Sequence, residues 1–382
     1  MSIHAAPIPI IARATYAAEP ATPAVSHPRH RCTTVHPVAP SHRSQPFDPP
    51  ANTDQWQRQG DDLAADDPDR AILRMAAASR SADPQRTVDT WPLRVTDPVR
   101  VDGYLLVSRL GAGGMADVYY AVAPTGRPVV VKILRAYRGA RDACQREYRL
   151  ACAVDADCTA PALGYGVATA GAYLVAAYLP GYRCGTTLVG SPMSAGQLWM
   201  LGSALARVLA AVHARGVVHC DVKPSNLLVR GHDVRVIDFG IARFVGERCG
   251  DHGIVQCSRG WASPEQLLTA PATPAVDVFA WGCLLAHLAG VHPFASQSEQ
   301  EWILRVQSAE PDLSGLPSGM DEVIRWTLAR DPRDRPSARE LATICRARCD
   351  ERSRPDAPAP GSKPSMIYSS RPATRSTASG RR

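Results

Sequence analysis

The stretch Val217–Gly240, VVHCDVKPSNLLVRGHDVRVIDFG, decides the fold that this sequence predicts. Two short apolar runs, Leu227–Val229 and Val234–Ile237, flank the turn Gly231-His232-Asp233. Apolar runs separated by a short glycine-containing turn predict a β-hairpin. The residues at the two ends of this hairpin carry most of the functional information in the chain.

Four polar residues flank the predicted hairpin. Asp221, Lys223 and Asn226 come just before it, and Asp238 comes directly after it. Because the two ends of a hairpin lie together, we expect these side chains at one edge. Phosphoryl transfer needs a carboxylate to accept the proton of an attacking hydroxyl and a cation to neutralise the moving phosphoryl group. It also needs a second carboxylate and an amide oxygen to hold magnesium. The stretch therefore indicates a phosphoryl-transfer site.

The same residues resemble the catalytic loop and the Asp-Phe-Gly motif of protein kinases. Cys220 stands where that family usually has the arginine of its His-Arg-Asp motif, so the catalytic loop is not of the Arg-Asp type. The resemblance implies that Asp221 is the general base and Lys223 the transition-state cation. It also implies that Asn226 and Asp238 bind Mg²⁺. A lysine two residues after the base is typical of the serine/threonine branch of the family.

A glycine-rich segment lies between two predicted strands, Tyr104–Leu110 and a second strand that runs through Ala121. A glycine loop between two strands argues against a dinucleotide fold, where a strand and a helix flank the loop. It resembles the flap that covers the ATP phosphates in protein kinases. Ala116 stands at the family's third glycine. The segment that the resemblance assigns to ATP consists of Leu110, Gly111, Ala112, Gly113, Gly114, Met115, Ala116, Asp117 and Val118.

Lysine is rare in this chain, since only three of its 43 basic residues are lysines. One of them, Lys132, lies in the predicted strand Pro128–Leu134, and another is Lys223. Both stand where the kinase resemblance requires a compact ammonium group on phosphate, which a planar guanidinium cannot replace. The predicted helix Asp142–Val154 carries Glu147, which the resemblance pairs with Lys132 to hold that lysine on the nucleotide. The placement of the lysines strengthens the kinase interpretation.

Later landmarks extend the resemblance to about residue 348 and predict the fold class. Ser258 would hydrogen-bond the base and its lysine, Asp277 would brace the catalytic loop, and Arg335 would pair with Glu265. A long apolar helix is predicted over Leu198–His213. The expected fold is α+β, the bilobal protein kinase fold. Its N-terminal lobe is an antiparallel β-sheet plus the helix called αC, and its C-terminal lobe is mainly helical.

The activation segment, Asp238–Glu265, lacks the usual means of regulation in this family. It contains no threonine and no tyrosine, and its only serines are Ser258 and Ser263, in the part that faces the substrate. Cys220 cannot bind a phosphate as the family's arginine does. We therefore predict an enzyme that does not depend on activation-loop phosphorylation. Redox control through cysteines is an alternative that the sequence leaves open.

Composition and charge narrow the class of protein. The net charge of +7 divides into 0 for residues 1–100, +2 for 101–350 and +5 for 351–382. No folded basic face is implied, and nucleic-acid binding is not expected. The 11 cysteines include no C-x-x-C pair, as expected of buried thiols in a reducing compartment. With no run of 18 apolar residues and no secretory signal, we expect a soluble, cytoplasmic protein without a membrane span.

The expected domain organisation has three parts. Residues 1–100 are rich in Pro and Ala and are expected to be disordered, with one short helix over 61–79. That helix is either transient or a docking element. Residues 101–350 form the protein kinase domain, and residues 351–382 form a basic, Ser/Pro-rich tail that is also expected to be disordered.

The sequence thus predicts an ATP- and Mg²⁺-dependent serine/threonine protein kinase that resembles the bacterial group and acts on serine and threonine hydroxyls of proteins. The alternative is a pseudokinase, a signalling scaffold that binds ATP without efficient transfer. All six polar residues that transfer needs are present, which argues against it. A small-molecule phosphotransferase shares part of the catalytic loop but not the Asp-Phe-Gly and Ser-Pro-Glu landmarks. The sequence does not predict the substrate, the signal or the oligomeric state.

Overall fold

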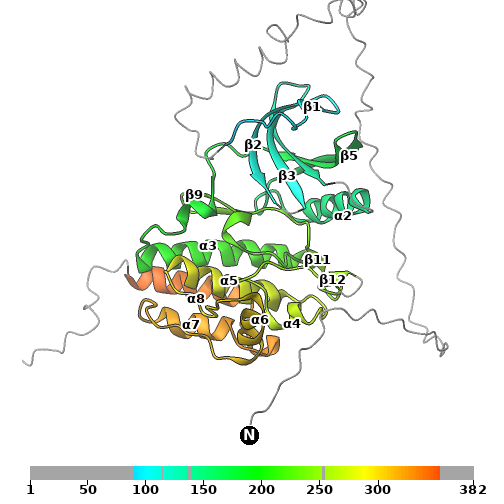
Figure 1. Ribbon diagram of the computed structural model, residues 1–382. Helices are drawn as coiled ribbons and strands as arrows, with labels where there is room; N and C mark the ends of the chain where they lie inside the picture. Colours follow the sequence, from blue (N-terminus) through cyan, green and yellow to red (C-terminus); the bar gives the residue numbers. More distant parts are fainter. Residues whose placement is uncertain (1–89, 114, 136–138, 252–253, 353–382) are drawn as a thin grey trace, which may run out of the picture. The chain divides into compact units, whose positions relative to one another are not determined.

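The structure is a computed structural model that describes residues 90–352, except 114, 136–138 and 252–253. The helix predicted over 61–79 and most of the two predicted tails lie outside the described residues. Figure 1 shows an antiparallel sheet with one helix, followed along the chain by a mainly helical part. The described residues thus form two lobes of an α+β fold, as predicted.

Six antiparallel strands form the sheet of the first lobe, in the order β1-β2-β3-β4-β6-β5. Their β-branched and aromatic residues suit a sheet with one buried face. The turn from β1 to β2 is sharp because Asp102 and Gly103 both have positive φ, 44° and 86°. The strands are β1 Arg100–Val101, β2 Tyr104–Ala112, β3 Ala116–Val122, β4 Pro128–Leu134, β5 Ala162–Ala168 and β6 Gly171–Ala177.

The sheet matches the predicted elements closely. The strand predicted over Pro128–Leu134 is β4 with the same bounds, and β2 continues two residues past the predicted Leu110. The helix predicted over Asp142–Val154 is α2, Ala140–Ala153, which packs against β5 and β6. Since Leu150 and Val154 belong to the core of the second lobe, this helix end connects the two lobes.

The second lobe is built around α3, a helix of 20 residues. A capping box between Ser194 and Gln197 satisfies amides at its first turn. It is apolar on most sides because α5 and α8 both pack against it. The helices are α3 Ala195–Ala214, α4 Pro264–Leu267, α5 Pro274–Leu288, α6 Glu299–Ser308, α7 Met320–Thr327 and α8 Ala338–Arg352.

Gly202 allows the close approach of α3 and α5. A Cβ atom there would lie 2.7 Å from Leu285 and 3.0 Å from Trp281, whose indole Nε1 donates to the Gly202 carbonyl at 3.0 Å. α3 is also the one described helix that is long and apolar enough to cross a membrane. More than half of it is buried inside the lobe, as in the core helix of a soluble protein. In the structure α3 is the central helix of the second lobe, against which α5 and α8 pack.

The predicted hairpin is confirmed and lies between the sheet and α3 (Figure 1). Its register pairs Leu227 with Val236 at the open end of the hairpin. The next residues on the two sides, Asn226 and Ile237, are therefore neighbours. The hairpin strands are β9 Leu227–Arg230 and β10 Asp233–Val236. The other short elements are β7 Arg183–Cys184, β8 Val217–Val218, β11 Arg243–Phe244, β12 Gly250–Asp251, β13 Ile254–Val255, η2 Gly185–Leu188, η3 Pro224–Asn226 and η4 Pro332–Asp334.

Residues 90–99 run beside β2, ahead of the expected domain start at Val101. Trp91 pairs with Arg109 in an antiparallel bridge, and Leu93 packs against the core of the sheet. The described fold therefore includes residues before the expected boundary. The division of the whole chain into one domain and two tails stays a prediction.

Candidate functional site

Asp221 is the centre of a compact hydrogen-bonded cluster before the hairpin. Its carboxylate accepts from Lys223 Nζ at 2.7 Å, from Asn226 Nδ2 at 2.9 Å and from Ser258 Oγ at 2.7 Å. Lys223 also donates to Ser258 Oγ at 2.7 Å. The structure thus brings together three of the predicted site residues and the predicted Ser258 contacts. The Asp221 side chain is 12% exposed, so a small group can still reach it.

Asp277 on α5 fixes the backbone that carries this cluster. Its fully buried carboxylate accepts from the amides of His219 and Cys220 at 2.8 Å each, and it lies 2.8 Å from His213 Nε2. Burial by itself raises the pKa of Asp277, but the hydrogen bond with His213, the nearby histidines and the hydrogen bond from the His219 amide together outweigh it and lower the pKa below its usual value. Asp277 is therefore an anion that holds Cys220 in an unusual backbone conformation, with φ of 62°.

A second cluster joins the two lobes through Lys132. Its Nζ donates to both carboxylate oxygens of Glu147 at 2.8 Å and to Asp238 Oδ1 at 2.7 Å. Burial by itself lowers the pKa of Lys132, but the two carboxylates outweigh it and raise the pKa. Burial raises the pKa of Glu147. Burial by itself would also raise the pKa of Asp238, but its contacts with Lys132 and with the Gly240 amide lower that pKa overall. The predicted contact between Lys132 and Glu147 is present.

Gly240 lies so close to this second cluster that a larger residue would push its side chains aside by a few tenths of an ångström. A Cβ atom at this position would lie 3.0 Å from Asp238 Oδ1, 3.3 Å from Lys132 Nζ and 3.4 Å from Glu147 Oε2. The Gly240 amide also donates to Asp238 Oδ1 at 3.1 Å. The phenylalanine between them, Phe239, is buried in the core of the second lobe. The Asp-Phe-Gly motif therefore directs its carboxylate toward the lysine and its ring into the core.

Two oxygens remain suited to a hard cation. Asp238 uses Oδ1 for Lys132 and Gly240, whereas its Oδ2 accepts no hydrogen bond from the described residues, and the side chain is 41% exposed. Asn226 donates its amide nitrogen to Asp221. Among the described residues, its Oδ1 has one hydrogen-bond contact, a long one of 3.5 Å with Ser225 Oγ. Carboxylate and amide oxygens are ligands that Mg²⁺ accepts. The donor set fits the predicted metal.

This donor set is incomplete by itself. Within residues 90–352 as described, no group of three or more His, Cys, Asp and Glu residues is arranged to hold a metal. Mg²⁺ is usually bound by one or two protein oxygens together with phosphate oxygens of a substrate. The site is therefore of the kind that would bind the metal together with a nucleotide.

The glycine-rich segment closes the end of the sheet beside these clusters. Gly113 donates to the Ala116 carbonyl at 2.9 Å, and Arg135 to that of Met115 at 2.9 Å. Ala116 is buried at the start of β3, so a side chain at the family's third glycine is accommodated in the sheet. Of the residues predicted to contact ATP, Leu110, Gly111 and Ala112 lie in β2, Gly113 and Met115 in the turn, Ala116, Asp117 and Val118 in β3, and Gly114 outside the described residues.

Two supporting residues were missed in the sequence. Gln266 on α4 donates to the Cys220 carbonyl at 2.8 Å and so connects α4 with the catalytic loop. Arg243 is 1% exposed and donates to backbone carbonyls of Ile241, Ala242 and Arg248 inside the activation segment. A single arginine or glutamine carries no distinguishing signal in a chain rich in polar residues.

Comparison with known proteins gives a consistent result. The family model of the protein kinase domain matches residues 104–344. The chain is 38% identical over 262 residues to the probable serine/threonine-protein kinase PkwA of Thermomonospora curvata, covering 65% of this chain and 35% of that protein. It is 33% identical over 259 residues to the serine/threonine-protein kinase AfsK of Streptomyces coelicolor, covering 64% and 32%. The match thus spans about a third of the length of these relatives.

Proposed function

Because the chain belongs to the protein kinase family, we propose that it transfers the γ-phosphoryl group of ATP to serine and threonine hydroxyls of proteins. The observation that carries this proposal is the presence of both clusters at once, Asp221 with Lys223 and Lys132 with Glu147 and Asp238. The names of the bacterial relatives support the serine/threonine class. An ATP-dependent reaction also fits the cytoplasmic location expected from the sequence.

The geometry suggests a role for each side chain. Asp221 would accept the proton of the acceptor hydroxyl as its oxygen attacks the γ-phosphorus and the bond to the β-phosphate oxygen breaks, releasing ADP. Lys223, next to Asp221, would neutralise charge on the moving group. Lys132, held by Glu147, would bind the α- and β-phosphates. Asn226 and Asp238 would hold Mg²⁺, which would offset the negative charge of the phosphates.

The first test is transfer of label from γ-labelled ATP with Mg²⁺ to a generic acceptor protein, followed by phosphoamino-acid analysis. We expect label on serine and threonine and none on tyrosine. Lys132→Met should lower the rate on the order of 10²-fold, the scale of losing one preorganised cationic donor. Lys363→Met is the matched control, since this lysine lies outside the family match. Nucleotide binding without ADP release by the wild type would instead favour a pseudokinase.

We also propose that activity does not require a phosphate on the activation segment. Cys220 is buried and hydrogen-bonds the Cys249 thiol, an interaction that, together with burial, raises its pKa well above the usual value. It therefore cannot hold a phosphate. Arg243 instead braces the segment from inside, through the Arg248 carbonyl at 2.9 Å and Gln256 Oε1 at 2.9 Å. These contacts order the segment without added charge.

Phosphatase treatment is accordingly expected to leave the transfer rate unchanged within about twofold, since the Arg243 contacts that order the described part of the segment need no phosphate. The measurement is the rate before and after treatment, with phosphosites mapped by mass spectrometry. Activity that disappears on dephosphorylation and returns with a phosphate between residues 241 and 262 would contradict this proposal.

A further inference from the structure

The segment 90–99 is attached to β2 by three backbone hydrogen bonds and to the core of the sheet by one apolar side chain. Trp91 and Arg109 exchange backbone hydrogen bonds at 3.0 and 2.8 Å, and Leu106 donates to the Val99 carbonyl at 2.9 Å. Leu93 packs against the core of the sheet. We call residues 90–99 the strap. It follows β2, the strand that leads into the glycine-rich segment.

Arg109 links the strap to β3 through two carboxylates. Its Nη1 donates to Asp97 Oδ1 at 2.5 Å, and its Nη2 donates to Asp117 Oδ1 at 2.5 Å. The side chains of Arg109 and Asp97 are 5% and 6% exposed, and that of Asp117 is 23% exposed. Tyr119 Oη donates to Asp97 at 3.0 Å. A chain of alternating charges therefore runs from the strap across β2 to β3.

Asp97 and Arg109 keep their charges near neutral pH. Burial by itself raises the pKa of Asp97, but hydrogen bonds from Arg109 and from the Arg94 amide outweigh it and lower the pKa. The hydrogen bond with Asp97 raises the pKa of Arg109. Burial and Asp97 together raise the pKa of Tyr119 to about 12, so its hydroxyl stays a donor. Buried charges held in this way are costly to separate.

The position of this charge chain connects it with the glycine-rich turn. The β2–β3 register shifts between Arg109 and Gly111, and such bulges bend a strand. Asp117 pairs with Ala112, and these two residues flank the turn at its base. Arg109 thus holds β2 and β3 together at the bend where the turn leaves the sheet.

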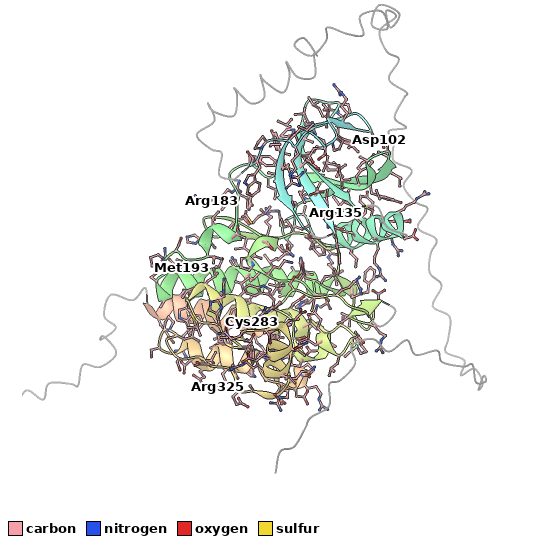
Figure 2. The ribbon with its side chains drawn as sticks, in the orientation of Figure 1. Asp102, Arg135, Arg183, Met193, Cys283 and Arg325 are labelled. Atoms are coloured by element: carbon pink, nitrogen blue, oxygen red, sulfur yellow. The ribbon has the colours of Figure 1, made fainter. Side chains whose placement is uncertain are left out.

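The contact between the strap and the sheet includes a hollow that is lined in part by charged side chains. A hollow of about 230 Å³ lies between strap and sheet, lined by residues that include Asp97, Arg109, Asp117 and Arg135. Arg135 lies 3.8 Å from Asp117 and donates its amide to the Met115 carbonyl in the turn. Figure 2 shows Arg135 on the α2 side of the sheet and Asp102 toward its opposite end.

We propose that the strap holds the glycine-rich turn in its nucleotide-binding position through Asp97, Arg109 and Asp117, with Asp97 and Arg109 as positioning residues. This inference rests on the proposed function, which assigns the turn to the ATP phosphates. If strap docking favours nucleotide binding by some factor, bound nucleotide must favour strap docking by the same factor. A purely structural strap would show no such reciprocity.

Hydrogen exchange of the full chain, with and without Mg²⁺ and a non-hydrolysable ATP analogue, tests the reciprocity. We expect the analogue to slow exchange of the amides in residues 91–99 by about fivefold, the lower end of typical coupling between sites. Protection of residues 110–118 without any change in 91–99 would overturn the strap proposal alone. No protection anywhere would overturn the proposed ATP binding, and the strap proposal with it.

A pair of matched variants gives an independent readout. Asp97→Asn removes the buried charge at nearly constant size, and we expect about a fivefold rise in the Kd of the analogue and in KM for ATP. The turnover number should change less than twofold. Asp102→Asn is the matched control. It also removes one carboxylate charge that accepts a tyrosine hydrogen bond, from Tyr173 at 2.8 Å, but Asp102 lies at the opposite end of β2 from the glycine-rich turn. Equal affinity of the two variants for the ATP analogue would overturn the proposal. The hydrogen-exchange experiment uses the wild-type chain, so it remains a test even if a variant does not fold.

Discussion

Asp221→Asn is expected to lower the rate of phosphoryl transfer by about 10²–10⁴-fold while nucleotide affinity stays nearly unchanged. Asparagine keeps the size of the side chain and an oxygen that can accept from Lys223 or Ser258. It cannot take up the proton of the acceptor hydroxyl, so the general-base contribution is lost. The nucleotide contacts assigned to Lys132 and the glycine-rich turn do not involve Asp221, and binding should persist.

Single-turnover transfer from labelled ATP, with the affinity of a fluorescent nucleotide measured on the same sample, separates these two effects. Asp157→Asn is a suitable control because its side chain is fully exposed and it lies outside both clusters. Its rate should equal that of the wild type. Transfer by Asp221→Asn at the wild-type rate would refute the assignment of the base. A parallel loss of nucleotide affinity would instead indicate a disturbed site.

Local signals explain why much of the site could be predicted from the sequence. The hairpin at 227–236 has a short turn between apolar runs, so its register is set by nearby residues. That register places Asn226 beside Ile237, the residue that precedes Asp238. Lys132 stood out because lysine is rare in a chain that otherwise uses arginine, and the expected contact with Glu147 is present at 2.8 Å.

The contacts that sequence reasoning missed are non-local. Asp97 and Arg109 are 12 residues apart, and their pairing depends on how the strap lies along β2, which no periodicity encodes. Arg243 is one of many arginines, and only its burial separates it from solvent-exposed ones. Tertiary packing determines which of these side chains become buried and paired, and the local patterns of a single sequence do not reveal that packing.

Arg335 supports the second lobe from a fully buried position. Its side chain, 0% exposed, donates to both oxygens of Glu265 at 2.6 and 3.0 Å. It also donates to the carbonyls of Ala329 and Ala275 at 2.7 and 2.9 Å, and its guanidinium lies over the Phe279 ring. The predicted ion pair with Glu265 is therefore present, at the end of the activation segment.

Arg335→Met is expected to destabilise the folded domain by about 3–5 kcal/mol, because it leaves the Glu265 carboxylate buried without its partner. For a domain of this size the loss corresponds to a fall in Tm of roughly 10 °C, measurable by calorimetry. Arg333→Met is the matched control, since that arginine pairs with Asp331 in a similar forked geometry while 87% exposed. Water screens such a surface pair, so its Tm should hardly change. Equal Tm values for the two variants would mean that the buried ion pair between Arg335 and Glu265 stabilises the domain no more than an exposed pair does. Other contacts would then hold the end of the activation segment.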